Sequence, residues 1–147
     1  MKKNAVLWAV ILFSGCSSVL QKQILATDNA PKAIGPYSQA VQVGRTIWCA
    51  GQIGLDPASG QLVEGGIVPE THRVMQNIGA VLQAAHADFA EVTMATVYLA
   101  DLADFQAFNA AYATYFPQAP PARATVQVAA LPRGARVQIA VTAVKLR

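Results

Sequence analysis

Cysteine, histidine and charged side chains are scarce in this sequence, and each scarcity excludes a class of site. The 147 residues include two cysteines and two histidines, and 13% of them carry a charge. Neither His72 nor His86 has a second ligand at metal-binding spacing, and no motif implies an organic cofactor. The 11 Lys and Arg residues form no run with interleaved aromatics, which argues against nucleic-acid binding. We therefore expect no metal, no cofactor and no nucleic-acid partner.

The apolar run at the N-terminus is too short to span a membrane. Residues 5–13 are nine apolar residues, whereas a membrane-spanning helix needs about 20. Lys2 and Lys3 precede this run and small residues follow it, which is typical of a secretory signal peptide. Removing these two lysines from the 11 basic residues leaves 9 against 8 acidic ones, so the mature chain has a net charge near +1.

The signal ends in a motif that is similar to a bacterial lipobox. Cys16 directly follows a Ser-Gly pair, and such a cysteine is acylated and becomes the new N-terminus, although a phenylalanine stands where leucine is usual. Ser17 is similar to the pattern that sorts lipoproteins to the outer membrane. We predict a signal peptide over residues 1–15, a tether over 16–22 and a folded domain over 23–147, in a lipid-anchored periplasmic protein. The alternative is a plain cleaved signal with an incidental cysteine.

The rest of the chain is long enough for one domain with a real core. Its single cysteine, Cys49, lies in an apolar run. With Cys16 acylated, Cys49 has no partner for an intramolecular disulfide. We therefore expect Cys49 to be a small core residue.

Periodicity and turn residues predict the strands. They are expected over residues 24–26, 40–44, 46–53 and 92–100. The last is an almost continuous apolar run, like a strand that is buried on both faces. Gly51 interrupts a good strand pattern, which often marks the close approach of a ligand or of another backbone.

Two amphipathic helices are expected to cover one face of a mixed sheet. The first begins at Pro69 and ends near His86, a residue type that tolerates positive φ. Its apolar stripe comprises Val74, Ile78, Val81, Leu82 and Ala85. The second is capped by Asp101 and runs to about Phe116. Its packing side is expected to hold Phe105, Phe108, Tyr112 and Tyr115, with Asn109 as a polar group beside them.

Two strand-like runs near the C-terminus flank Leu131-Pro132-Arg133-Gly134, whose proline and glycine suit a type I turn. Arg123 opens the first run, directly after a stiff Pro-Pro loop. A guanidinium fixed at a strand start can bind a carboxylate with two parallel hydrogen bonds. Considered alone, Arg123 could equally be a surface arginine paired with nearby carboxylates.

Two long stretches resemble the signatures of the Rid/YjgF family of reactive intermediate (enamine/imine) deaminases. They are APKAIGPYSQAV, residues 30–41, and PARATVQVAALPRGARVQI, residues 121–139. The resemblance extends over residues 24–145. It implies a chorismate-mutase-like α+β fold, a ring-shaped homotrimer and sites between subunits. Self-association also agrees with the sheet face that two helices leave uncovered.

The resemblance also assigns roles to residues that would otherwise be assigned to the fold. Arg123 would hold the carboxylate of a small 2-imino or enamino acid, and the backbone at Thr125 would assist. Four residues would line the same pocket: Tyr37, Gly51, Phe105 and Asn109. By itself, Tyr37 would be interpreted as a core tyrosine with a satisfied hydroxyl.

The sequence departs from the family at Gln138, where active deaminases have a glutamate that holds the attacking water and transfers protons. An amide can hold a water through its carbonyl oxygen but cannot accept the proton, and general acid–base help is typically worth roughly 10²–10⁴ in rate. Glu64, Glu70 and Glu91 remain open as substitutes.

Two functions therefore stay open. One is hydrolytic deamination of small 2-imino or enamino acids to 2-oxo acids, with Arg123 and Gln138 as the catalytic pair and an activity that the amide could weaken or abolish. The other is a non-catalytic module that binds small 2-oxo acids, or a holdase, on the same trimeric scaffold.

Overall fold

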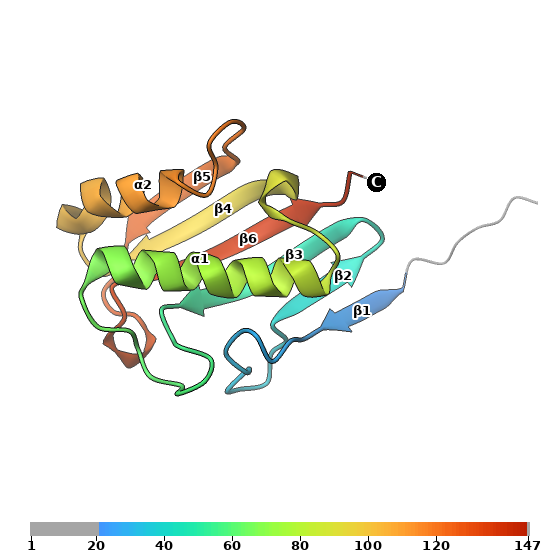
Figure 1. Cartoon of the computed structure of the whole chain (residues 1–147), viewed down its shortest axis with the longest axis horizontal. Helices are drawn as coiled ribbons and strands as arrows, with labels where there is room; N and C mark the ends of the chain where they lie inside the picture. The colour runs from blue at the N-terminus through green and yellow to red at the C-terminus, as the bar shows by residue number, and fades with distance from the viewer. Residues whose placement is uncertain (1–20, 147) are drawn as a thin grey trace, which may run out of the picture.

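Residues 21–146 are described by the computed structural model, and they form one α+β domain with a six-stranded mixed sheet and two α-helices (Figure 1). The strands are β1 Lys22–Leu25, β2 Ala40–Val43, β3 Thr46–Ile53, β4 Val92–Leu99, β5 Ala122–Gln127 and β6 Val137–Val144. The helices are α1 Ile67–Ala84 and α2 Phe105–Ala113. The strand order is β1-β2-β3-β6-β4-β5, and the β4–β5 pair alone among these is parallel. The predicted fold class is confirmed.

The predicted signal peptide, Cys16 and most of the tether lie outside the described residues. The tether was expected to include residue 22, but β1 begins there and pairs with β2. Among residues 21–146, neither helix has the length and apolarity that a membrane crossing requires.

Both helices lie on one face of the sheet, in front of it in Figure 1. Strand β6 shows how the sequence divides the two faces, because successive side chains of a strand point to opposite sides. Val137, Ile139, Val141 and Ala143 are buried, whereas the residues between them are half-buried. The predicted apolar stripe of α1 is buried as well. The core therefore fills the space between helices and sheet.

The opposite face of the sheet remains open in the protomer. Trp48, Met94 and Val126, on three different strands of this face, are 47%, 37% and 47% exposed. The prediction that residues 92–100 are buried on both faces is therefore wrong for a single protomer. In β4, Ala95, Val97 and Leu99 are buried under the helices, while on the other face Met94 is exposed and Thr96 and Tyr98 are only half-buried by residues 21–146.

The second helix is shorter than predicted. Asp101 does cap a helix, but it is the 3₁₀ helix Leu102–Asp104, where its carboxylate accepts from the N–H of Ala103 at 2.9 Å. Helix α2 follows and ends at Ala113, because the Thr114 hydroxyl donates to the Ala111 carbonyl and competes with the helical bond.

The expected packing side of α2 is only partly buried. Phe108 and Tyr112 are in the core and Tyr115 packs against it, but Phe105 at the helix start is 40% exposed. That exposure leaves the Phe105 ring free to contact Arg123 instead.

The segment between β5 and β6 also differs from the prediction. Leu131–Gly134 contains the 3₁₀ helix Pro132–Gly134, and Arg133 has φ 57°, whereas a type I turn requires about −90° at that position. The Arg133 Nη1 donates to the Gly60 carbonyl at 3.2 Å, which ties this segment to another loop. The two flanking strands are not sheet neighbours, since β4 lies between them.

Candidate functional site

Tyr37, Gly51 and Gln138 line one cavity of about 370 Å³. The cavity lies between the loop that precedes β2, the end of β3 and the side chain of Gln138 on β6. Tyr37 is half exposed at its wall, so the interpretation of Tyr37 as a core tyrosine is wrong. The resemblance places these three residues in one cleft between subunits together with Phe105, Asn109 and Arg123, and the protomer brings Tyr37, Gly51 and Gln138 to one cavity.

Gly51 makes room for Gln138. A Cβ atom at position 51 would lie 2.4 Å from Nε2 and 2.9 Å from Cδ of Gln138, both far below van der Waals contact. The sequence predicted that a ligand or a backbone comes close to Gly51, and within the protomer the neighbour is the Gln138 side chain. The absence of a side chain at Gly51 allows the Gln138 amide to extend across β3 along the cavity wall.

The loop that carries Tyr37 is fixed by a buried amide. Gln39 is 3% exposed, and its Nε2 donates to the carbonyls of Pro31 at 2.8 Å and Thr27 at 3.0 Å. Its Oε1 accepts from the N–H of Thr27. Because one side chain satisfies several backbone groups, the loop keeps a defined shape at the cavity mouth.

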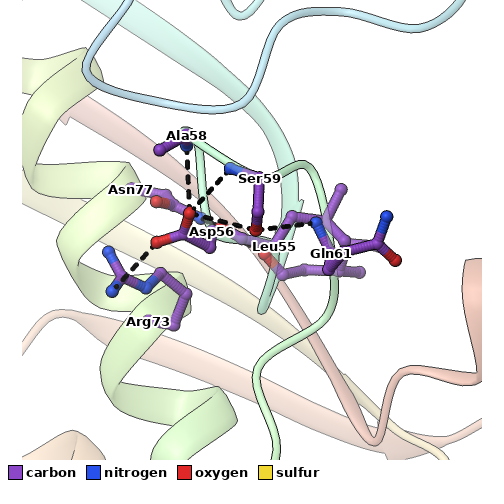
Figure 2. Close-up of polar contacts among 8 residues, drawn as sticks. Leu55, Asp56, Ala58, Ser59, Gln61, Arg73 and Asn77 are labelled. Atoms are coloured by element: carbon purple, nitrogen blue, oxygen red, sulfur yellow. Dashed lines mark hydrogen bonds and ion pairs between the residues drawn. The ribbon is translucent and has the colours of Figure 1, made fainter.

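Polar contacts hold the segment that carries Leu55, and Figure 2 shows these contacts. The buried Asn77 donates through Nδ2 to the Leu55 carbonyl at 2.9 Å, and Leu55 lines the cavity. Asp56 accepts from the N–H groups of Ala58 at 3.0 Å and Ser59 at 2.9 Å, and it pairs with Arg73 at 3.5 Å. The backbone bond from Ser59 holds the pKa of Asp56 below its ordinary value. The cavity is therefore bounded by well-anchored segments.

Arg123 lies in a different compartment, between β5 and α2. Its Nη2 donates to Oδ1 of Asn109 at 2.7 Å. Its Cζ lies 4.8, 5.5 and 5.8 Å from the ring centroids of Tyr112, Phe108 and Phe105. A second cavity of about 360 Å³ adjoins Arg123, Asn109 and Tyr112. Hydrogen bonding and cation–π contacts thus hold the guanidinium in one orientation.

The charge of Arg123 is not neutralised within the protomer. Among residues 21–146, no carboxylate lies within ion-pair distance of it, so the alternative of a surface arginine paired with carboxylates is wrong for this part of the chain. Burial raises the pKa of Tyr112 to about 12, so its phenol stays neutral beside the guanidinium. The group is therefore an oriented cation that no carboxylate of residues 21–146 pairs with.

Thr125 lies two residues beyond Arg123 on the same side of β5. Its side-chain hydroxyl is buried and has no hydrogen-bond partner among the described residues. Strand β5 forms an edge of the sheet, and an edge strand presents unpaired backbone groups. The predicted backbone role of Thr125 is compatible with this position.

The two groups of site residues lie on opposite faces of the sheet. In the register, Arg123 is opposite Ala95, which is opposite Val141, and all three belong to the helix-covered face. Gln138 is opposite Tyr98 and belongs to the open face. A single protomer therefore does not bring Arg123 and Gln138 to the same small ligand.

No carboxylate of residues 21–146 lines the cavity of Gln138. Glu64 is exposed in the loop before α1. Glu91 completes the capping box of the 3₁₀ helix Phe89–Glu91, whose N-cap is Asp88, and also accepts from the N–H of Leu146. Glu70 is 3% exposed and accepts from the N–H of Arg136 at 2.8 Å on the helix-covered side. None of the three takes the place of an acid at position 138 within the protomer.

Glu70 belongs to a small charged network. The Arg136 guanidinium donates to both carboxylate oxygens of Asp104, at 2.9 and 2.8 Å. The Arg136 backbone N–H donates to Glu70. Burial raises the pKa of Glu70, and the hydrogen bond from Arg136 opposes that rise. The network joins the start of α1 and the start of β6, two residues before Gln138.

The remaining candidate side chains have structural positions. Cys49 is buried as predicted, and burial raises the pKa of its thiol to about 12. His72 Nδ1 lies 3.0 Å from the Tyr115 hydroxyl, and His86 is exposed with φ 55°. Residues 21–146 hold no cluster of three or more His, Cys, Asp or Glu side chains that could bind a metal ion.

Sequence reasoning missed several cavity residues. Lys32, Ile34 and Pro132 line the cavity with Gln138. All three stand inside the two signature stretches, but position within a motif does not say which side chains face a cavity. Their roles depend on loop shapes, which the sequence pattern does not encode.

This fold and site define a class of protein: a small α+β domain that keeps an oriented arginine on one face of its sheet and an amide-lined cavity on the other. The chain belongs to the Endoribonuclease L-PSP family, whose match extends over residues 27–145. This match and the relatives below confirm the resemblance to the Rid proteins.

Curated relatives and solved structures cover nearly the whole domain. The chain is 56% identical to the 2-iminobutanoate/2-iminopropanoate deaminase of Mus musculus, over 88% of this chain and 95% of the relative. It is 51% identical to the Homo sapiens protein of the same name, over 87% and 93%. The crystal structure of RidA from the Antarctic bacterium Psychrobacter sp. PAMC 21119 superposes with a TM-score of 0.81 and 41% identity, over 84% and 99%. That of E. coli TdcF with bound serine has a TM-score of 0.81 and 32% identity, over 84% and 98%.

Proposed function

We propose that this protein hydrolyses small 2-imino or enamino acids to 2-oxo acids and ammonia. The observation that carries the proposal is Arg123, an oriented guanidinium beside an open cavity, with no carboxylate of residues 21–146 at ion-pair distance. Such a group binds the carboxylate of a small acid with charge-assisted hydrogen bonds. Relatives at 51–56% identity carry the name of this activity. Ribonuclease activity is not part of the proposal, because the basic residues form no run with interleaved aromatics.

The complete site joins two neighbouring protomers of a homotrimer. Arg123 of one copy and the cavity of Gln138 in the next would meet across the interface, because one chain keeps them on opposite faces. The exposed Trp48, Met94 and Val126 on the open face supply apolar surface for such contact. In this assembly Tyr37, Gly51 and Gln138 form one half of each site, and Phe105, Asn109, Arg123 and Thr125 form the other.

In the proposed reaction, Arg123 holds the substrate carboxylate and the Gln138 carbonyl oxygen holds the attacking water. An enamine first becomes the imine by moving a proton from its nitrogen to C3. The water oxygen adds to C2 of the C=N bond while one water proton passes to the nitrogen. The hydroxyl proton then reaches the nitrogen as the carbon–nitrogen bond breaks, which releases ammonia and leaves the 2-oxo acid. Gln138 cannot accept the water proton, so solvent or the substrate nitrogen must take it. We therefore expect a slower enzyme than one with an acid at this position, by roughly 10²–10⁴.

The second candidate function is binding of 2-oxo acids without turnover. It is favoured by one observation: the cavity of Gln138 holds no carboxylate of this chain among its described residues. The Arg123 compartment does not depend on that acid. A holdase activity, in which the open sheet face binds other proteins, would also be a function without turnover.

One experiment separates pocket from chemistry. Arg123→Ala should abolish 2-oxobutyrate binding in calorimetry, while Arg45→Ala, a change at an exposed arginine of the β2–β3 turn, should not. Gln138→Glu should leave binding intact or slightly weaker and raise 2-iminobutanoate hydrolysis about 10-fold or more. Vigorous hydrolysis by the unmodified protein with no gain from Gln138→Glu would show that another group carries the proton. If neither the unmodified protein nor any variant binds a 2-oxo acid, the proposal that Arg123 binds a substrate carboxylate is wrong.

We further propose that the mature protein is anchored to the periplasmic side of the outer membrane through Cys16. The support is the sequence motif alone, since this residue precedes the described part of the chain. Cells grown with labelled palmitate should yield a labelled protein that pellets with membranes, and Cys16→Ser should lose both properties. An unlabelled wild-type protein in the soluble periplasm would leave only a plain signal peptide.

A further inference from the structure

Lys32 lines the same cavity as Gln138, in the loop that Gln39 anchors. Its ammonium lies 3.4 Å from a carboxylate oxygen of Asp28, but the two side chains are 83% and 91% exposed. Pairs with this exposure contribute little and exchange readily with solvent. Lys32 also lines the neighbouring groove that Asp28 lines, so its ammonium is shared with that carboxylate. Because the pair is exposed to solvent, the ammonium can turn from Asp28 to an anion at the cavity mouth.

The other walls of the cavity are mostly apolar. They are formed by Pro31, Ile34, Ile53, Leu55 and Pro132. A volume of about 370 Å³ is at the lower end for small-molecule pockets, which usually combine apolar walls with a few placed polar groups. Such walls suit a short chain of methylene groups between two polar ends, and the cavity is larger than a two-carbon side chain needs.

The substitution at position 138 changes the charge of this cavity. A carboxylate there would repel a second anion on a ligand, whereas the Gln138 amide is neutral and can donate a hydrogen bond. Among residues 21–146, Lys32 is then the charged side chain that lines the cavity. The same amide that weakens proton transfer thus removes an obstacle to dianionic ligands.

We propose that this cavity selects 2-imino and 2-oxo acids with a second carboxylate at the end of a short methylene chain, the class of 2-oxoglutarate and its imine. Lys32 is the specificity-determining residue and receives the distal carboxylate. Arg123 of the neighbouring copy holds the carboxylate next to the reacting carbon. The inference rests on the proposed function, because that function supplies the first carboxylate contact.

The test compares ligands that differ only at the distal end. Calorimetry on the assembled mature protein would use 2-oxoglutarate, its 5-methyl ester and 2-oxobutyrate. We expect 2-oxoglutarate to bind about 10-fold more tightly than the ester, the factor of one charge-assisted contact. Lys32→Gln should remove this preference and leave 2-oxobutyrate binding within about twofold. Lys22→Gln, a change at an exposed lysine of β1, is the matched control and should change neither value.

Two outcomes would overturn the inference alone. Equal affinity for 2-oxoglutarate and its ester would show that the cavity accepts apolar chains and that Lys32 only covers them with its aliphatic stem. A dianion preference that survives Lys32→Gln would assign the distal carboxylate to another group. In both cases the proposed function still stands if the protein binds 2-oxobutyrate and Arg123→Ala abolishes that binding. Absence of binding by all three ligands would instead remove the proposed function with the inference.

Discussion

At the scale of single residues, Gly51 and Gln138 depend on one another. Gly51→Ala should displace the Gln138 amide, because the new Cβ would stand 2.4 Å from Nε2. We expect kcat/KM for 2-iminobutanoate to fall about 10-fold or more, since misplacing a catalytic group by 1 Å has effects of this size. The melting temperature should change little, because Gly51 is exposed and does not have a positive φ.

A double substitution supplies the control for this prediction. In a Gln138→Ala background the side chain that clashes is gone, so adding Gly51→Ala should cost no further activity. An equal loss in both backgrounds would mean that position 51 contacts the ligand or a neighbouring chain directly.

Glu70 makes a pH-dependent contribution to stability. Burial raises its folded-state pKa above the ordinary 4.5, so the folded state binds the proton more tightly than the unfolded state. The resulting stability is fully present below pH 4.5 and is lost as pH rises through the folded-state pKa. Glu70→Gln should flatten this part of the profile, because Gln Oε1 still accepts from the N–H of Arg136. Urea unfolding between pH 4 and 7 measures the effect.

Glu64→Gln, the same substitution at an exposed glutamate, is the matched control for this experiment. A Glu70→Gln profile parallel to the wild type would show that the Glu70 carboxylate titrates alike in both states.

At this scale the sequence can single out candidate residues but not their surroundings. Arg123, Gln138 and Gly51 stand in motifs or break a strand pattern, so they could be identified without coordinates. The burial of Glu70 could not be predicted, because its partner Arg136 is 66 positions away and approaches only through the sheet. The same holds for Lys32, whose cavity wall is closed by Pro132 from the other end of the chain.

At the scale of elements, the end of α1 is strained at one residue. The N–H of Ala87 donates to the Leu82 carbonyl and that of His86 to the Gln83 carbonyl, the two bonds of a Schellman motif. His86 therefore occupies the left-handed position, φ 55°, that glycine prefers. His86→Gly should raise the free energy of unfolding by about 1 kcal/mol, measured by urea titration at fixed protein concentration.

His86→Ala distinguishes strain from side-chain effects. Alanine also disfavours positive φ, so this variant should show no gain. Equal stabilisation by alanine and glycine would trace the effect to the imidazole rather than to the backbone.

The elements themselves were largely predictable, and their connections were not. The burial stripe of α1 and the limits of β3 follow directly from periodicity. The parallel pairing of β5 with β4, and the insertion of β6 between β4 and β3, depend on which long-range contacts bury the most apolar surface. Local patterns also could not predict the positive φ of Arg133, which a contact with Gly60 accompanies.

At the scale of the whole molecule, the open sheet face predicts self-association. A mature domain that begins at Lys22, without lipid, should run as a trimer in light scattering, because Trp48, Met94 and Val126 need cover. Trp48→Glu should shift the assembly toward smaller species and lower the hydrolysis rate with it. A stable folded monomer at micromolar concentration would contradict the shared site.

The placement of Arg123 and Gln138 on opposite faces has a genetic consequence. A chain with Arg123→Ala keeps an intact cavity, and a chain whose cavity is blocked keeps its arginine. Neither allele alone would support activity. Co-expressed, the two would form mixed rings with a junction at which both undamaged surfaces meet, so a pair of null alleles would complement one another.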